Sequence, residues 1–197
     1  ETGRVTRLEK TEDGFKVEWG EGSVTARSVL LATGVAKRRP PMEEPLHDEA
    51  LAKGPIRSCP ICDGYEVTDK RVGVIGNDSH GVAEAIFLRG YTDDITLIAP
   101  DKATDLRQQD WERLDDLGIR AVDGACQAVA MDGRCITVET AEGHFTFDSL
   151  YPALGSDVHS DLAAMAGARL SDSGCILIDA HQRTNVPGLY AAGDVVL

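Results

Sequence analysis

The sequence predicts an α/β fold with a parallel sheet that is covered on both faces. Arg71-Val72-Gly73-Val74-Ile75 is a continuous apolar run of the kind found in buried parallel strands. A segment with apolar residues at helical spacing, residues 82–88, follows it, and a second apolar run occupies residues 94–99. Together they form a β-α-β unit, which predicts a right-handed crossover and a Rossmann-like, nucleotide-binding type of domain.

The segment before this unit is predicted to be strands and a linker. Residues 3–31 carry loosely alternating apolar residues with turns at Asp13-Gly14 and Glu21-Gly22. Residues 28–32 read as a short buried strand that ends at Thr33-Gly34. Pro40, Pro41 and Pro45 then predict an extended linker, so we place a domain boundary there.

The segment after the unit predicts one long helix and further strands. Residues 105–117 place Leu106, Trp111, Leu114 and Leu117 on one helical stripe. Residues 119–150 alternate short strands and turns, which predicts a β-meander. A short helix is expected at 160–167, and the last strands are expected at 175–179 and 189–192.

Composition excludes several classes of function. The 197 residues carry a formal net charge of −13, which disfavours nucleic acid and anionic membrane surfaces as partners. No apolar run approaches the roughly 18 residues of a membrane-spanning helix. The five cysteines are odd in number and scattered, unlike a secreted disulfide framework, so we expect a cytoplasmic protein. The first residues do not form a signal peptide, and the ends of the sequence suggest a fragment of a longer protein.

A Cys-x-x-Cys pair, Cys59 and Cys62, is the strongest candidate for chemistry. Structural zinc would need two further ligands at close spacing, which the sequence does not offer, so we expect no metal. The favoured interpretation is a redox pair, in which one thiolate attacks and its neighbour resolves the mixed disulfide. Asp63 directly follows and is a candidate proton carrier. The other cysteines, Cys126, Cys135 and Cys175, are interpreted as small core residues.

The loop between the first strand and the helix of the β-α-β unit resembles a damaged dinucleotide motif. Gly76 and Gly81 hold the outer positions, but Asp78 stands where a second glycine lets the backbone approach a pyrophosphate. The loop either binds a nucleotide or only begins the helix. Asp101, after the second strand, would suit NADH and oppose NADPH if either binds.

Two other turns have the placement of cofactor contacts. Gly193-Asp194 follows an apolar strand and could aim a carboxylate at a polyol, and Thr33-Gly34 could bring backbone near a flat ring. Taken singly, each is also compatible with an ordinary turn.

In combination, these segments resemble the low-molecular-weight thioredoxin reductase family of FAD-dependent pyridine nucleotide-disulfide oxidoreductases. The resemblance covers nearly the whole chain, and its more specific parts are the Cys-x-x-Cys-Asp-Gly and Gly-x-x-Ala-x-Gly-Asp segments. The matching residues are Leu30-Leu31-Ala32-Thr33-Gly34, Cys59-Pro60-Ile61-Cys62-Asp63-Gly64, Val72-Gly73-Val74-Ile75-Gly76 with Glu84-Ala85, Ala153-Leu154-Gly155, and Val186 to Asp194.

The resemblance implies an interrupted flavin domain. Residues 1–43 would be its later strands, 44–150 an inserted NAD(P)-binding-like domain with the dithiol, and 151–197 the return into the flavin domain. The family's first β-α-β unit, which carries its own FAD loop, would lie upstream of this sequence.

The resemblance also implies roles for single residues. Cys62 would exchange electrons with FAD, Cys59 would attack the partner's disulfide, and Asp63 would move protons. The proposed FAD contacts are Thr33, Gly34, Gly193 and Asp194, and those to NADPH or NADH are Gly76, Gly81, Glu84 and, from its position, Asp101. The implied partner is a thioredoxin-like protein or a small-molecule disulfide or dithiol, and the full-length protein would be a homodimer.

The departures from the family pattern fall on the nicotinamide side. Asn77-Asp78 replaces part of the glycine-rich loop, and Ala99, Pro100 and Asp101 replace a histidine and paired arginines. The leading hypothesis is a flavin-dependent thiol-disulfide oxidoreductase. A dithiol oxidase or a ferredoxin-linked reductase that does not use NADPH is the first alternative, and a non-catalytic nucleotide-binding or interaction module is the second.

Overall fold

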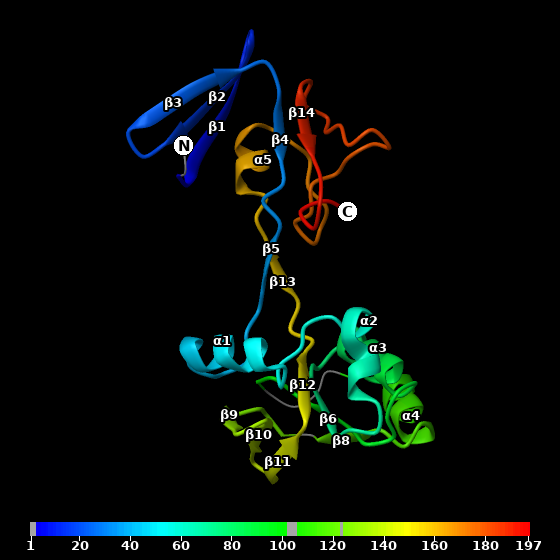
Figure 1. Cartoon of the computed structure of the whole chain (residues 1–197). Helices are drawn as coiled ribbons and strands as arrows, with labels where there is room; N and C mark the ends of the chain where they lie inside the picture. The colour runs from blue at the N-terminus through cyan, green and yellow to red at the C-terminus, as the bar shows by residue number, and fades with distance from the viewer. Residues whose placement is uncertain (1–2, 102–105, 123) are drawn as a thin grey trace. The chain divides into compact units, whose positions relative to one another are not determined.

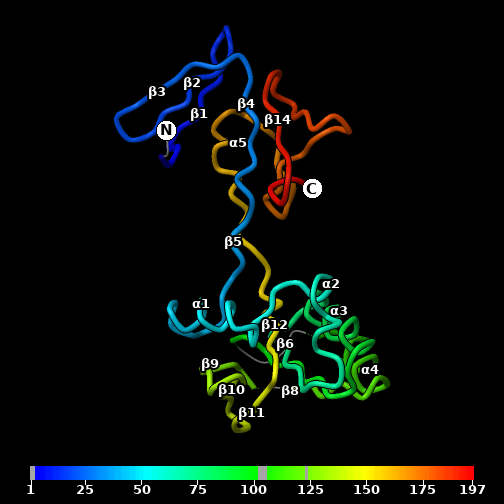
Figure 2. Tube along the Cα trace, in the orientation of Figure 1, coloured from blue at the N-terminus to red at the C-terminus, as the bar shows by residue number. Residues whose placement is uncertain are grey.

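The computed structural model describes residues 3–101, 106–122 and 124–197, which form two compact units. Unit 1 comprises residues 1–36 and 156–197, and unit 2 comprises residues 37–155. The continuous trace in Figure 2 shows that unit 2 is a single excursion of the chain between the two segments of unit 1. The sequence-based boundaries, after residues 43 and 150, lie inside unit 2.

Unit 2 is built on a four-stranded parallel sheet (Figure 1). Its order is β12 (Ser149–Pro152), β6 (Val72–Ile75), β7 (Ile95–Ile98) and β8 (Arg120–Val122). Both central strands are buried along their whole length, as their largely apolar sequences predicted, and the one polar residue among them, Thr96, is buried too. The predicted β-α-β unit is therefore confirmed, with α3 (Ser79–Leu88) as its helix.

Different layers cover the two faces of this sheet. On one face lie α3 and α4 (Gln108–Asp116), and on the other lies an antiparallel meander of β9 (Ala128–Asp132), β10 (Cys135–Thr140) and β11 (Gly143–Phe147). Alternate side chains of each strand enter opposite cores, so Val74 packs with the helices and Ile75 with the meander. This is the three-layer arrangement that the sequence predicted. The predicted helix 105–117 begins at Asp105, which lies outside the described residues.

The segment that leads to the dithiol differs from the prediction of an extended linker. It contains α1 (Glu44–Lys53), followed by α2 (Pro60–Asp63) and the 3₁₀ turn η1 (Gly64–Val67). Pro45 was interpreted as a mark of extended chain, but it occupies the first turn of α1. A proline fits there because the first helical N–H groups have no partner within the helix.

Unit 1 combines a meander with short parallel pairing. β1 (Val5–Thr11), β2 (Gly14–Trp19) and β3 (Gly22–Ala26) are antiparallel. β4 (Val29–Leu31) pairs in parallel with β14 (Leu189–Ala191), which joins residues about 160 positions apart in the chain. The remaining elements are β5 (Val35–Lys37), which pairs with β13 (Ser156–Val158), and α5 (Asp161–Met165). The strands predicted in 3–31 and the helix predicted at 160–167 are confirmed.

The strand predicted at residues 175–179 is wrong. Only Ile176 makes bridges there, to Leu170 and Val196, and it alone is fully buried. The Asp179 carboxylate accepts hydrogen bonds from the backbone N–H groups of His181 and Arg183, at 2.8 and 2.9 Å. This side chain turns the backbone at Asp179, so the pairing of Ile176 and Leu177 with neighbouring segments does not extend into a strand.

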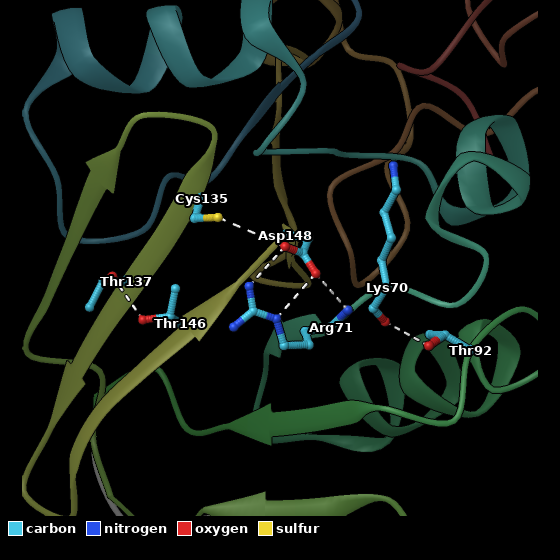
Figure 3. A network of polar contacts seen from close by, with 7 residues as sticks. All are labelled: Lys70, Arg71, Thr92, Cys135, Thr137, Thr146 and Asp148. Carbon is cyan, nitrogen blue, oxygen red and sulfur yellow. Dashed lines mark hydrogen bonds and ion pairs between the residues drawn. The ribbon is translucent and has the colours of Figure 1, made fainter.

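An ion pair joins the beginnings of two neighbouring strands in unit 2 (Figure 3). Arg71, before β6, donates to both carboxylate oxygens of Asp148, before β12, from Nε at 3.2 Å and Nη2 at 2.9 Å. The Arg71 backbone N–H adds a third bond at 3.0 Å, and the Cys135 thiol lies 3.8 Å from the same carboxylate. These contacts fix the register of β12 against β6, and β12 carries a residue of the candidate active site.

Candidate active site

The dithiol lies at the start of α2. Cys59 is the residue before the helix, Cys62 lies within it, and the two sulfurs form a disulfide. The Cys59 carbonyl accepts hydrogen bonds from the backbone N–H groups of Cys62 and Asp63, at 2.9 and 3.2 Å. Pro60 opens the helix, where its ring fits. Cys62 is exposed and Cys59 is half-buried, so the disulfide lies at the surface of unit 2.

Asp63 is tied to two residues that the sequence motifs did not indicate. The Tyr151 hydroxyl donates to Asp63 Oδ1 at 2.8 Å, and Arg57 Nη1 lies 3.3 Å from Asp63 Oδ2. Arg57 also donates to Glu66 Oε2 at 2.8 Å. Tyr151 is 88 positions from Asp63, so no local motif could reveal this contact.

Exposed apolar side chains flank the dithiol. Ile61, between the two cysteines, is 82% exposed, and Tyr65, just after them, is 81% exposed. The rings of Phe87 and Tyr91 lie 5.8 Å apart, and a Cβ added at Gly64 would come within 2.9 Å of the Tyr91 ring. Exposed apolar side chains therefore flank the disulfide in the sequence, among polar residues such as Ser58 and Glu66, and such side chains suit contact with another molecule.

The glycine-containing loop brings β6 and α3 very close together. A Cβ at Gly76 would lie 2.9 Å from the Cα of Gly81, and a Cβ at Gly81 would lie 3.0 Å from the Cα of Gly76. Between them, Asp78 Oδ1 accepts hydrogen bonds from the backbone N–H groups of His80 and Gly81, both at 3.0 Å. The protein's own carboxylate thus occupies the donors that would otherwise meet an anion at the start of the helix.

A cleft of about 800 Å³ opens beside this loop, at the carboxyl ends of β6, β7 and β12. Asp78 and Asp101 line it together with Arg38 and Arg39. Such an edge is the usual ligand site of a parallel sheet. Asp78 already occupies the helix amides that would meet the pyrophosphate of NADPH or NADH, whereas Asp101 follows β7, the position that suits NADH.

Glu84, the other residue assigned to a nicotinamide cofactor, faces α3's own first turn. His80 Nε2 lies 3.1 Å from Glu84 Oε1. Burial raises the pKa of Glu84, although the charges of His80 and Lys37 oppose that shift. The described contacts of Glu84 are thus made within unit 2.

The four residues assigned to FAD follow two paired strands of unit 1. Because β4 and β14 are parallel and in register, Thr33-Gly34 and Gly193-Asp194 follow their carboxyl ends at one edge. The Thr33 hydroxyl donates to the His159 carbonyl at 2.6 Å, and the His159 N–H donates to the Gly34 carbonyl at 3.1 Å.

These turns have the open backbone that a flat ring and a polyol require. Gly34 and Gly193 have φ of +64° and +82°, and nothing lies within 4 Å of a Cβ at either position. Asp194 is exposed, and Thr33 lines a cleft of about 1050 Å³ with largely apolar walls. Thr33 is the one of the four assigned residues that lines this cleft, and the open turns leave room for a cofactor beside it.

The remaining cysteines lie outside the dithiol. Cys126 is 5% exposed, and burial raises the pKa of its thiol to about 11. Cys135 and Cys175 are half-buried. Among the described residues, no group of three or more His, Cys, Asp or Glu side chains could hold a metal ion. Over the same residues, no helix combines the length and apolar content needed to cross a bilayer.

The fold and the dithiol define a class of redox proteins, and comparison with known families agrees. The pyridine nucleotide-disulphide oxidoreductase family matches residues 1–197, so the chain belongs to this family. Members of the family depend on FAD and use NAD(P)H. The resemblance drawn from the motifs is confirmed.

Several known proteins are similar to this chain. The F subunit of alkyl hydroperoxide reductase from Staphylococcus aureus (strain MSSA476) is 32% identical over 201 residues, covering 98% of this chain and 39% of that protein. The crystal structure of T. acidophilum thioredoxin reductase is 26% identical with a TM-score of 0.64, covering 98% of this chain and 66% of that one. Thioredoxin reductase from Streptococcus pyogenes MGAS5005, 22% identical with a TM-score of 0.83, covers 98% and 65% and supports the fold.

Proposed function

We propose that this chain carries the dithiol and part of the flavin site of a flavin-dependent thiol-disulfide oxidoreductase. The chain spans 39% of the length of the curated relative, so the activity is proposed for the longer protein. The observation that carries the proposal is the surface disulfide of Cys59 and Cys62, with Asp63 as the next residue of the same short helix.

Reduction and exchange at the dithiol balance in electrons and protons. Two electrons and two protons convert the Cys59–Cys62 disulfide to two thiols. The Cys59 thiolate attacks a partner disulfide, which forms a mixed disulfide and releases one partner thiolate. The Cys62 thiolate then attacks Cys59 Sγ, which restores the internal disulfide and releases the second partner thiolate. Asp63 takes up and returns the protons.

The order of the two sulfurs follows the family resemblance. Cys62 is the more exposed residue of the pair, so exposure alone does not favour Cys59 as the attacking sulfur. Trapping of a partner by serine variants of the two cysteines separates the two orders.

FAD, when bound, supplies or accepts the electron pair that opens or closes the disulfide. Thr33 and Gly34 would line its ring system, and Gly193 and Asp194 would contact its polyol. The two open glycine turns at one edge of the β4–β14 pair support this assignment.

A second candidate function differs in the source of electrons. Asp78 occupies the helix amides at which a dinucleotide pyrophosphate would bind, and this favours a dithiol oxidase or a ferredoxin-linked reductase over an NADPH-dependent enzyme. In this case Gly76, Gly81, Glu84 and Asp101 would have structural roles and no nicotinamide cofactor to contact.

Anaerobic titration of the flavin-loaded full-length protein separates these functions. Bleaching of the flavin by stoichiometric NADPH or NADH would show that the nucleotide site works despite Asp78. Bleaching by dithiols alone would support the oxidase, and bleaching by reduced ferredoxin would support the linked reductase. Absence of a flavin response, with both thiols near their ordinary pKa of about 8.5, would indicate a non-catalytic interaction module.

The partner is proposed from the same surface. A thioredoxin-like protein or a small-molecule disulfide would approach the apolar side chains of Ile61 and Tyr65 beside the disulfide. The full-length protein would be a cytoplasmic homodimer, as the cysteine usage and the family resemblance suggest. Analytical ultracentrifugation of the full-length protein tests the dimer.

A further inference from the structure

The Asp63 carboxylate is held by side chains from two other segments of unit 2. Tyr151 lies on β12, next to β6 in the parallel sheet, and is fully buried. Its ring belongs to the core formed with α3 and α4, and its hydroxyl donates to Asp63 Oδ1 at 2.8 Å. A buried hydroxyl needs a partner, so this bond orients the carboxylate and also satisfies the phenol.

Arg57 fixes the second carboxylate oxygen. Its side chain is only 11% exposed, and Nη1 lies 3.3 Å from Asp63 Oδ2. Nη2 donates to Glu66 at 2.8 Å, and Nε donates to Ser149 Oγ at 3.3 Å. The Arg57 N–H donates to the Leu150 carbonyl at 2.9 Å, so β12 anchors both Arg57 and Tyr151.

Tyr151 stays neutral and Arg57 stays positively charged at and around neutral pH. Burial, followed by the hydrogen bond to Asp63, raises the pKa of Tyr151 well above its ordinary value. Burial opposes the charge of Arg57, but Glu66 and Asp63 outweigh it and raise its pKa. Tyr151 therefore stays a donor and Arg57 a cation while the thiols and carboxylates exchange protons.

We propose that Tyr151 and Arg57 are positioning residues that hold the Asp63 carboxylate in one orientation beside the dithiol. The inference rests on the proposed role of Asp63 in thiol-disulfide exchange. Each contact engages a different carboxylate oxygen, so together they fix the rotation of the group about its χ angles. Proton transfer at the dithiol then occurs at a carboxylate that does not need to reorient.

The test is the pH profile of exchange between the reduced, flavin-loaded protein and the aromatic disulfide 5,5′-dithiobis(2-nitrobenzoate). Tyr151→Phe keeps the buried ring and removes the hydroxyl, and Arg57→Gln removes the charge. We expect each to slow exchange roughly tenfold, which is less than the roughly hundredfold cost of a 1 Å misplacement because one of the two contacts remains. The shape of the pH profile should change in each variant, because the carboxylate loses one of the two contacts that hold it.

A double-variant cycle shows whether Tyr151 acts through Asp63. In an Asp63→Asn background, Tyr151→Phe should cause no further slowing, because the group that it positions is no longer ionisable. Tyr190→Phe, on β14, is the matched control for loss of a phenol and should leave the profile unchanged. Far-ultraviolet circular dichroism and thermal unfolding check that each variant folds, and Arg57→Lys replaces Arg57→Gln if the latter does not.

The possible results separate this inference from the proposed function. If Asp63→Asn exchanges at the parental rate, the role of Asp63 in the proposed function fails. If Asp63→Asn is slow but Tyr151→Phe and both Arg57 variants match the parent, only the positioning inference fails. A profile of unchanged shape, or an equal loss from Tyr151→Phe in the Asp63→Asn background, would also overturn it.

Discussion

Two helices of unit 2 begin in opposite ways. Before α2 stands Cys59, whose side chain makes no capping hydrogen bond and joins a disulfide. Before α3 stands Asp78, whose carboxylate accepts two backbone hydrogen bonds from the first turn of that helix. One start leaves its side chain available for chemistry, and the other uses its side chain to complete the helix.

The two helix starts therefore differ in whether a side chain already occupies the backbone donors. The dithiol turn lies among exposed apolar side chains and next to a supported carboxylate, Asp63. The loop between β6 and α3 keeps the close approach of Gly76 to Gly81. Its backbone N–H groups, which could bind an anion, already donate to Asp78. A Rossmann-like frame can therefore persist for packing while its ligand chemistry changes.

The largest expected effect concerns the dithiol at the start of α2. Cys62→Ser should abolish electron transfer between flavin and thiols, because no internal disulfide can form, and the rate of flavin bleaching in stopped-flow absorbance should fall by more than about a hundredfold. This variant should also trap a partner as a mixed disulfide through Cys59.

Cys59→Ser is the matched control for that trapping. It should also lose electron transfer but should trap no partner, since the attacking sulfur is absent. Recovery of a mixed disulfide from Cys59→Ser and not from Cys62→Ser, on non-reducing gels, would reverse the order of the two sulfurs.

The second prediction concerns Cys126, the buried thiol that lines the cleft beside Asp78. Burial raises the pKa of Cys126 to about 11 from an ordinary value of 9.0. A raised folded-state pKa gives stability that is complete below pH 9.0 and is lost as pH rises toward 11. The free energy of unfolding should therefore fall by about 2 kcal/mol more in the parent than in Cys126→Ala over that interval.

Urea unfolding at several pH values checks this difference. Cys135→Ala is the control for loss of a thiol elsewhere in unit 2, at a half-buried position. Parallel curves for parent and Cys126→Ala would show that the Cys126 thiol does not ionise differently in the folded protein.

The smallest expected effect tests whether the backbone N–H groups at the start of α3 bind a nucleotide once Asp78 is replaced. Asp78→Gly frees the N–H groups of His80 and Gly81, and glycine at this position costs a helix only a few tenths of a kcal/mol. The Kd for NADPH or NADH should fall by about tenfold, or about 1.4 kcal/mol, in fluorescence titrations.

Asp78→Asn separates charge from occupancy. Its amide oxygen can still accept both backbone hydrogen bonds, so it should gain less nucleotide affinity than Asp78→Gly. Equal affinities in the parent and both variants would mean that the cleft excludes the dinucleotide for another reason.

The parts of the fold that local pattern determines could be predicted from the sequence. The β-α-β unit, the meanders and the three layers of unit 2 follow from apolar runs, helical spacing and turn residues. The helix at Glu44–Lys53 was missed because Pro45 is compatible with both a linker and a first helical turn. The strand at 175–179 failed because Asp179 forms a local turn that apolar periodicity does not reveal.

The candidate site also has one part that the sequence predicted and one part that it did not. Cys59, Cys62 and Asp63 are adjacent in sequence, so their spacing alone suggested redox chemistry. Tyr151 and Arg57 reach Asp63 only through the pairing of β12 with β6 and the bond of Arg57 to Leu150. Such tertiary contacts have no sequence signature, and the role of Asp78 as a helix cap also became visible only in three dimensions.

The chain leaves unit 2 very close to the point where it enters. The Arg38 N–H donates to the Gly155 carbonyl at 3.1 Å, although 117 positions separate them. A domain whose two ends lie close together can be inserted into another protein, or exchanged between related proteins, with little disturbance of the surrounding chain. The dithiol, its supporting residues and the cleft beside Asp78 would all move together in such an exchange, so the host flavin domain could change while the sulfur chemistry stays the same.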